Sequence, residues 1–362
     1  MSTSHFNVSK KNHSIFCPVK IVDIQRRAEE LLLFASMDAA NALHHSLTCK
    51  LMTIRIYSPS PNIIAVQAWH HGGGREKLAG FTLNHRSVSP VITETDDEYI
   101  LVSGNMEARV AKSGEIGVTF LYNNRILTST GPEDMALIAE TGGQTALRER
   151  LSLDVGEKIF GLGEHGMPIA RNGQSIDSWN ASSDMIFEAS NKCMPFYLSN
   201  KKYGVFVNHS TRVNFDIAHA GASKSQFSVP GQMLEYRIIA GDSLKHVLSL
   251  FADLIGKPAL PPAWSFGLNM SASALAEYND ESVLEYVDGM IERGIPISIF
   301  HFGGLWMKDF EWTGFLWDQE RFPDPIGLIR SLHDRGVRVC LWINPFVSQK
   351  SRLFSEGMDG NY

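Results

Sequence analysis

The sequence has few cysteines and no long apolar run, and each shortage excludes a class of protein. The four cysteines form no C-x-x-C pair, which argues against a zinc site or a disulfide framework; they are Cys17, Cys49, Cys193 and Cys340. No segment approaches the roughly 20 consecutive apolar residues of a membrane-spanning helix. The N-terminal residues also hold no apolar stretch typical of a secretion signal. We therefore expect a cytoplasmic protein that does not contact a membrane.

An excess of basic charge is missing as well. The chain has 33 Lys and Arg against 39 Asp and Glu, so its formal net charge is −6, and we expect no nucleic-acid partner. The run of His and Gly at positions 70–74 lacks the G-K-[ST] ending of a phosphate loop. The 13 histidines are scattered along the chain, and no metal site is predicted.

Residues 1–242 are predicted to form an antiparallel β-sandwich. Short β-type runs alternate with turn residues at close intervals, the pattern of an all-β domain. Hairpin turns are expected at Ser113-Gly114 and Asn123-Asn124. The clearest strands are Ile63 to Trp69, Tyr99 to Val102, Met106 to Ala111, Gly117 to Tyr122, Arg125 to Ser129, Phe196 to Leu198, Gly204 to Asn208 and Leu234 to Ile239.

Residues 243–362 change to an alternation of strands and helices. A linker helix is expected after Asp242-Ser243, followed by helices from Asp280 and from Pro325. The predicted strands are Trp264 to Met270, Ile297 to Phe302 and Val337 to Ile343. This order is typical of a (β/α) barrel, which takes roughly 250 residues when complete. About three strands fit, so we expect an incomplete (β/α)8 (TIM) barrel whose open sheet edges favour association or poor solubility.

In such barrels the chemistry lies at the C-terminal ends of the strands, and the segment after Phe302 is the richest of these. Trp306, Trp312 and Trp317 lie within twelve residues of one another, together with Lys308. Indole faces that stack on a pyranose and charged groups that bond its hydroxyls would suit a sugar site. The alternative interpretation is that these aromatic residues only pack the loop against the barrel rim.

An ordered set of motifs across residues 150–350 resembles glycoside hydrolase family 31. The first group of motifs is Gly161-Leu162-Gly163-Glu164, Arg171-Asn172-Gly173-Gln174, Pro195-Phe196-Tyr197, Gly204 to Asn208 and Pro261-Pro262-Ala263-Trp264. A second group is similar to the α-xylosidase branch in particular: His301-Phe302, Trp306-Met307-Lys308, Arg321 to Pro325 and Cys340 to Pro345.

The resemblance implies a mutarotase-like β-sandwich followed by the barrel, and retaining, exo-acting hydrolysis of α-glycosides without a metal or organic cofactor. Retention needs a nucleophile and a general acid/base, both carboxyl groups. In the family these lie on the fourth strand and beyond, and neither motif is present in this chain. We therefore assign no catalytic residue and expect the chain alone to be inactive. The carboxylates at hand are interpreted as surface charges or helix caps: Asp309, Glu311, Asp318 and Asp324.

Substrate-binding positions transfer more readily, and the resemblance places Trp306, Lys308, Trp312 and Trp342 around the −1 subsite. Trp312 and Trp342 are expected to contact the sugar ring. Relatives carry an Asp where Gly303 stands, so one hydrogen-bond acceptor for a sugar hydroxyl is missing. The segment Ser271 to Leu275 also lacks the aromatic residue that the α-xylosidase branch uses to close its pocket.

Several interpretations remain open at this point. The first is an α-xylosidase acting on an α-linked oligosaccharide or α-xyloside, with an α-glucosidase as the alternative within that class. A non-catalytic carbohydrate-binding or degenerate remnant and a protein-contact module are the others. The resemblance is also compatible with a homo-oligomer. Glu164 and Arg171 either line a loop that projects toward the barrel mouth or form a salt bridge inside the sandwich.

Overall fold

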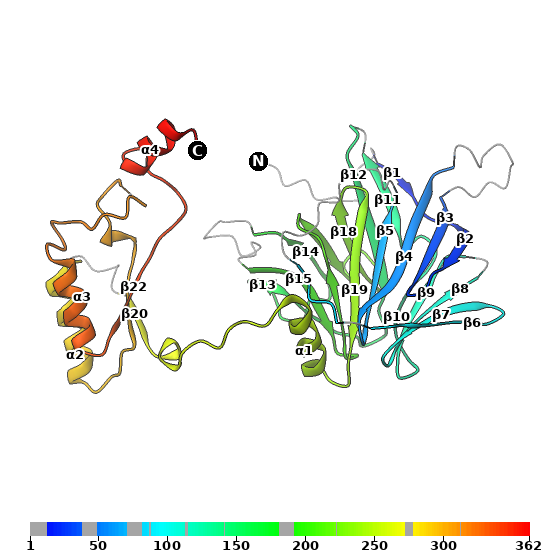
Figure 1. Ribbon diagram of the computed structural model, residues 1–362, viewed down its shortest axis with the longest axis horizontal. Coiled ribbons are helices and arrows are strands. Elements are labelled where there is room, and N and C mark those ends of the chain that lie inside the picture. Colours follow the sequence, from blue (N-terminus) through cyan, green and yellow to red (C-terminus); the bar gives the residue numbers. More distant parts are fainter. Residues whose placement is uncertain are drawn as a thin grey trace. The chain divides into compact units, whose positions relative to one another are not determined.

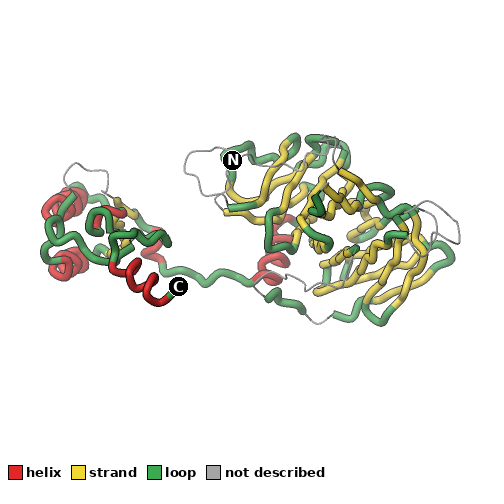
Figure 2. The backbone as a smooth tube through the Cα atoms, turned by 90° about the horizontal axis from the view of Figure 1, so that it is seen from above, coloured by secondary structure: helices red, strands yellow, loops and turns green. Residues whose placement is uncertain are grey.

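The computed structural model describes residues 13–37, 49–70, 82–86, 88–112, 115–140, 142–180, 192–221, 223–271, 278–311 and 313–362. The chain divides into two compact units, Met1–Lys257 and Pro258–Tyr362. The prediction of an all-β N-terminal part followed by alternating strands and helices is confirmed at this level. In Figure 2 the first unit is built mainly of strands, whereas helices and strands alternate in the second.

The strands of the first unit pair in antiparallel sheets. One sheet has the order β1 (His13–Phe16), β11 (Ala136–Glu140), β12 (Thr145–Ser152), β18 (Lys224–Pro230), β17 (Val213–Ile217) and β14 (Gln174–Ser178). A larger sheet has the order β13 (Ile159–Glu164), β15 (Lys192–Ser199), β16 (Tyr203–Val207), β19 (Met233–Ala240), β5 (Ile63–Trp69), β4 (Leu51–Ser60), β3 (Glu30–Ser36) and β2 (Lys20–Arg26). A third has the order β10 (Arg125–Thr130), β9 (Val118–Tyr122), β8 (Met106–Ala111), β7 (Glu98–Ser103) and β6 (Val91–Glu94).

Figure 1 shows the strands of these sheets in the first unit. One hydrophobic core is shared by the three sheets. It is formed where alternate residues of each strand turn inward, as in β8, whose burial alternates along its length. Leu147 comes from the first sheet, Val66 from the larger sheet and Phe120 from the third, and all three are fully buried or nearly so. The predicted Asn123-Asn124 turn joins β9 to β10 with φ of 49° and 60°, the left-handed conformation that tight hairpins need. The Ser113-Gly114 turn lies outside the described residues.

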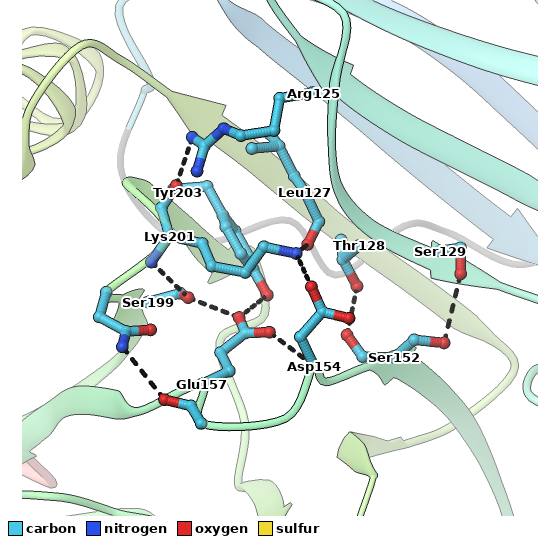
Figure 3. A network of polar contacts seen from close by, with 12 residues as sticks. Arg125, Leu127, Thr128, Ser129, Ser152, Asp154, Glu157, Ser199, Lys201 and Tyr203 are labelled. Atoms are coloured by element: carbon cyan, nitrogen blue, oxygen red, sulfur yellow. Dashed lines mark hydrogen bonds and ion pairs between the residues drawn. The ribbon is translucent and has the colours of Figure 1, made fainter.

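A network of polar contacts holds the connection between β12 and β13 (Figure 3). The Glu157 carboxylate accepts hydrogen bonds from the Tyr203 hydroxyl at 2.7 Å and from the Ser199 hydroxyl. Lys201 forms an ion pair with Asp154 at 2.5 Å. Glu157 and Ser199 are buried, and an unpaired polar group inside the domain would lower its stability. These hydrogen bonds remove that cost. The network fixes the start of β13 relative to the β15–β16 turn.

The helix α1 (Leu244–Ile255) packs on the outer face of the larger sheet. Ser243 caps it as predicted, since its hydroxyl accepts a hydrogen bond from the His246 amide. Phe251 stacks on Phe196 with ring centroids 3.8 Å apart, and its edge meets Phe206. The sequence places the domain boundary between residues 242 and 243. In the structure α1 belongs with the sheets because of these contacts, and the first compact unit runs to Lys257.

The second unit contains a parallel sheet of order β20 (Asn269–Ser271), β21 (Ile299–Phe302) and β22 (Arg338–Leu341). The connecting helices are α2 (Asp280–Glu292) and α3 (Pro325–Asp334), and α4 (Arg352–Gly360) follows β22. Asn279 and Ser282 form a capping box at the start of α2, and Asp324 caps α3 ahead of Pro325 as predicted. The apolar stripe of α2 and the aromatic residues after β21 share one core.

Two local expectations differ from the structure. The predicted strand from Trp264 to Met270 is wrong over its first half, where η2 (Ala263–Phe266) forms a 3-10 turn. The hydroxyl and amide of Ser265 both bond the carbonyl of Pro262, a local turn that competes with an extended backbone. The helix α4 was not expected, because only Leu353, Phe354 and Met358 among its nine residues are large apolar side chains; Ser351 caps it.

Candidate functional site

The C-terminal ends of the three parallel strands meet around an open hollow in the second unit. The register pairs Ser271 with His301 and His301 with Cys340, so the strands end side by side. The hollow has a volume of about 420 Å³ and is lined by Asn269, Ser271, His301, Gly303, Gly304 and Trp342. Amide, hydroxyl and imidazole groups therefore stand beside one indole ring. This combination suits a polyhydroxylated ligand that also has an apolar face.

Trp342 is held in the hollow by contacts on two sides. Its amide donates to the Phe302 carbonyl at 2.9 Å, which continues the strand pairing one residue past β22. A side chain at Gly304 would place its Cβ only 3.0 Å from Cζ3 of the indole. The glycine therefore lets the short helix η3 (Gly304–Trp306) approach the ring of Trp342 closely.

Trp306 lies in the core and supports Trp342 from behind. Its side chain is 2% exposed, and its indole N–H donates to the Trp342 carbonyl at 2.8 Å. Its ring packs on Trp317, with centroids 5.0 Å apart. Trp306 is not among the residues that line the hollow. Its geometry is that of a residue that positions Trp342.

The other two predicted binding residues lie elsewhere or are not described. Lys308 pairs with Glu311 at 3.1 Å, its side chain is 57% exposed, and it does not line the hollow. Trp312 lies outside the described residues. Of the four predicted residues, the structure thus places Trp342 in the lining and Trp306 beside it. Their roles toward a sugar stay predictions.

The carboxylates of this region serve the loop itself. Asp318 accepts from the Glu320 amide at 3.0 Å, and Asp309 pairs with Arg321 at 3.1 Å. The Asp324 carboxylate accepts from the Gly327 amide at the start of α3. The contacts of Asp309 and Asp324 agree with their interpretation as a surface charge and a helix cap, whereas Asp318 is only 9% exposed and caps a turn of the loop.

Glu164 and Arg171 do not form a pair with each other. Arg171 is buried and donates to the backbone carbonyls of Gly161, Pro168 and Gly163. Glu164 instead pairs with Lys192 near the surface, at 3.0 Å. The guanidinium therefore stabilises the backbone of the loop after β13. The predicted alternative, a salt bridge between Glu164 and Arg171, is wrong.

Two residues near the site were not predicted from the sequence to have a role there. Arg321 ties the loop together, because one guanidinium nitrogen donates to the Leu305 carbonyl at 3.2 Å and another binds Asp309. Tyr278 lies buried against the edges of Phe302 and Phe322, and burial raises the pKa of its hydroxyl. Arg321 belongs to the motif Arg321 to Pro325, so the sequence does mark its position. Nothing in the sequence around Tyr278 marks it.

Within the described ranges, no group of three or more His, Cys, Asp and Glu side chains is close enough to hold a metal ion. No helix among the described residues is both long and apolar enough to span a membrane.

Two family models match the chain. Residues 53–216 match the glycosyl hydrolase 31 N-terminal galactose mutarotase-like domain. Residues 258–362 match the glycosyl hydrolases family 31 TIM-barrel domain. The matched ranges fall one within each compact unit, and the second range coincides with the unit that carries the hollow.

Curated relatives give the same assignment. The chain is 36% identical over 99% of its length to the α-xylosidase XylQ of Lactiplantibacillus pentosus, covering 47% of that protein. It is 34% identical over 88% of its length to an α-xylosidase of Emericella nidulans, covering 43% of it. An α-glucosidase of Saccharolobus solfataricus is 28% identical over 64% of the chain, which covers 35% of that enzyme. The chain thus spans about half the length of the α-xylosidases that it matches.

The fold is shared with a dextranase from Flavobacterium johnsoniae solved with glucose. The TM-score is 0.78 at 18% identity, over 95% of this chain and 41% of the dextranase.

Proposed function

Because the chain belongs to glycoside hydrolase family 31, we propose that its hollow binds the terminal sugar of an α-xyloside. The observation that carries this proposal is the pair of α-xylosidases that are 36% and 34% identical to the chain. The hollow supports it, since Trp342 offers an indole face and Asn269 and His301 offer hydrogen-bonding groups. Trp306 would position Trp342. Lys308 and Trp312, which follow Trp306 in the sequence, would contact the same sugar.

Hydrolysis itself needs groups that the hollow does not supply. A retaining glycosidase uses two carboxyl groups roughly 5–5.5 Å apart, one as nucleophile and one as general acid/base. Among the residues that the structure describes, no Asp or Glu lines the hollow. The proposal is therefore a retaining, exo-acting α-xylosidase in which a longer protein supplies the carboxyl pair, and this 362-residue chain alone is inactive.

Sugar binding tests the proposal directly. Titration calorimetry of the chain with D-xylose and with D-glucose should show binding of both, with xylose tighter. Trp342→Ala should weaken xylose binding about three- to tenfold, the effect of losing one aromatic stacking contact. Trp264→Ala removes an exposed tryptophan that does not line the hollow and is the matched control.

Three results would contradict parts of this assignment. Absence of xylose binding, or equal losses in the two variants, would overturn the hollow as the sugar site. Turnover of an aryl α-xyloside by the chain alone would overturn its inactivity.

Two features favour a second candidate, an α-glucosidase. Gly303 lines the hollow without a side chain, which leaves room for the C6 hydroxymethyl group that distinguishes glucose from xylose. The similarity to the α-glucosidase of Saccharolobus solfataricus agrees with this possibility. Tighter binding of glucose than of xylose in the same titration would favour this second candidate.

A further inference from the structure

A second and larger cavity lies beside the hollow in the same unit. It has a volume of about 660 Å³ and is lined by Leu305, Asp309, Phe310, Ser348, Gln349 and Lys350. We propose that this cavity, here called the Phe310 cleft, binds the sugar on the leaving-group side of the scissile bond. The inference rests on the proposed function, because it takes the hollow as the site of the terminal xylosyl residue.

The side chain of Phe310 is exposed to solvent, and its backbone adopts a strained conformation. Its side chain is 77% exposed and its φ is +62°, a left-handed conformation that bulky residues rarely adopt. The Ser348 hydroxyl bonds the Phe310 carbonyl, and the Glu311 amide bonds the Lys308 carbonyl at 3.0 Å, so the turn is held in place. A strained backbone that presents an apolar ring without burying it is typical of a ligand contact.

Polar groups surround this ring as a sugar would require. The Lys350 ammonium lies 5.9 Å from the centre of the Phe310 ring, and Asp309, Ser348 and Gln349 line the same cleft. The ring can stack on the apolar face of a pyranose while the ammonium donates to its hydroxyls and the carboxylate accepts from them. The volume is within the roughly 300–1,000 Å³ range of small-ligand sites.

The cleft and the hollow meet on one short element. Gly304 lines the hollow and the next residue, Leu305, lines the cleft. Arg321 fixes the wall between them, since it donates to the Leu305 carbonyl and binds the Asp309 carboxylate. A disaccharide whose terminal residue occupies the hollow therefore has the cleft next to it for its second sugar.

Titration of the full chain with two ligands separates the two sites. D-xylose fills only the hollow, whereas an α-D-xylosyl-D-glucose disaccharide would fill both. Phe310→Ala and Lys350→Met should each weaken disaccharide binding about three- to tenfold and leave the affinity for xylose within about twofold. Two variants on separate segments keep the test valid if one of them fails to fold.

Matched controls come from the neighbouring chain. Phe315→Ala removes an exposed ring at a similar positive φ that does not line the cleft, and Arg352→Ala removes an exposed cation two residues from Lys350. Neither should change the affinity for either sugar. Disaccharide affinity that is unchanged in both test variants, or xylose affinity that falls equally, overturns the cleft and leaves the proposed function standing. If the unsubstituted chain binds neither sugar, both are overturned.

Discussion

Glu149 is a carboxyl group enclosed between the two larger sheets of the first unit. It is fully buried, and it accepts hydrogen bonds from the Arg150 amide at 3.0 Å and the Tyr236 hydroxyl at 3.2 Å. Burial raises the pKa of this carboxyl to about 8, and the nearby Asp134 carboxylate adds to the shift. The folded protein therefore carries Glu149 protonated at neutral pH.

This group makes the first unit less stable as the pH rises from mildly acidic to about 8. Between the unfolded pKa of roughly 4.3 and the folded value, the folded state holds a proton that the unfolded state has lost. The free energy of unfolding should thus fall as pH rises through this window, by up to about 1.4 kcal/mol per pH unit, and level off above it. We expect Glu149→Gln to flatten the dependence of the melting temperature on pH, and Glu115→Gln, on an exposed residue, to leave it unchanged. Parallel pH profiles for the two variants would refute this role.

At the scale of single elements, the helix starts show what a sequence can predict. Ser243 and Asp324 were readable because a cap bonds an amide only a few residues away. The strands of the first unit were readable because short runs of β-type residues alternate with turn residues. By contrast, the outward-turned Phe310, the bond from Trp306 to the Trp342 carbonyl and the burial of Tyr278 depend on contacts between distant segments. No local pattern in the sequence encodes such contacts, so these parts of the candidate site could not be derived.

The helix α1 depends on its aromatic contacts with the larger sheet. Phe251 is 5% exposed and stacks on Phe196, so Phe251→Ala leaves a cavity and should lower the unfolding free energy of the first unit by about 3–5 kcal/mol. Leu248→Ala truncates a largely exposed side chain of the same helix and should have little effect. Calorimetric melting of the variants measures the difference. Equal melting temperatures for the two variants would mean that α1 is not an integral part of the first unit.

At the scale of the whole molecule, the sheet of the second unit leaves groups available for pairing. Among the described strands, β20 and β22 each pair on one side only. Ile343, Phe346 and Val347 follow β22 with largely exposed apolar side chains. An open edge beside apolar surface favours association between chains.

We expect the 362-residue chain to associate as its concentration rises, as measured by light scattering. A charge placed beside the edge should reduce the association, so Ile343→Lys is the test variant. Ile169→Lys changes an exposed isoleucine of the first unit in the same way and is the control. A constant monomer mass at all concentrations would contradict the prediction, and so would equal effects of the two variants.

The packing of Trp306 on Trp317 has a spectroscopic consequence. Two indole rings with centroids 5.0 Å apart and planes inclined by 56° are close enough for their electronic transitions to couple, which gives a paired signal in circular dichroism. Both rings belong to the core of the second unit, so this signal would report the folding of that unit within the intact chain. If this signal is lost at a temperature different from the melting temperature of the antiparallel sheets of the first unit, the two units unfold separately.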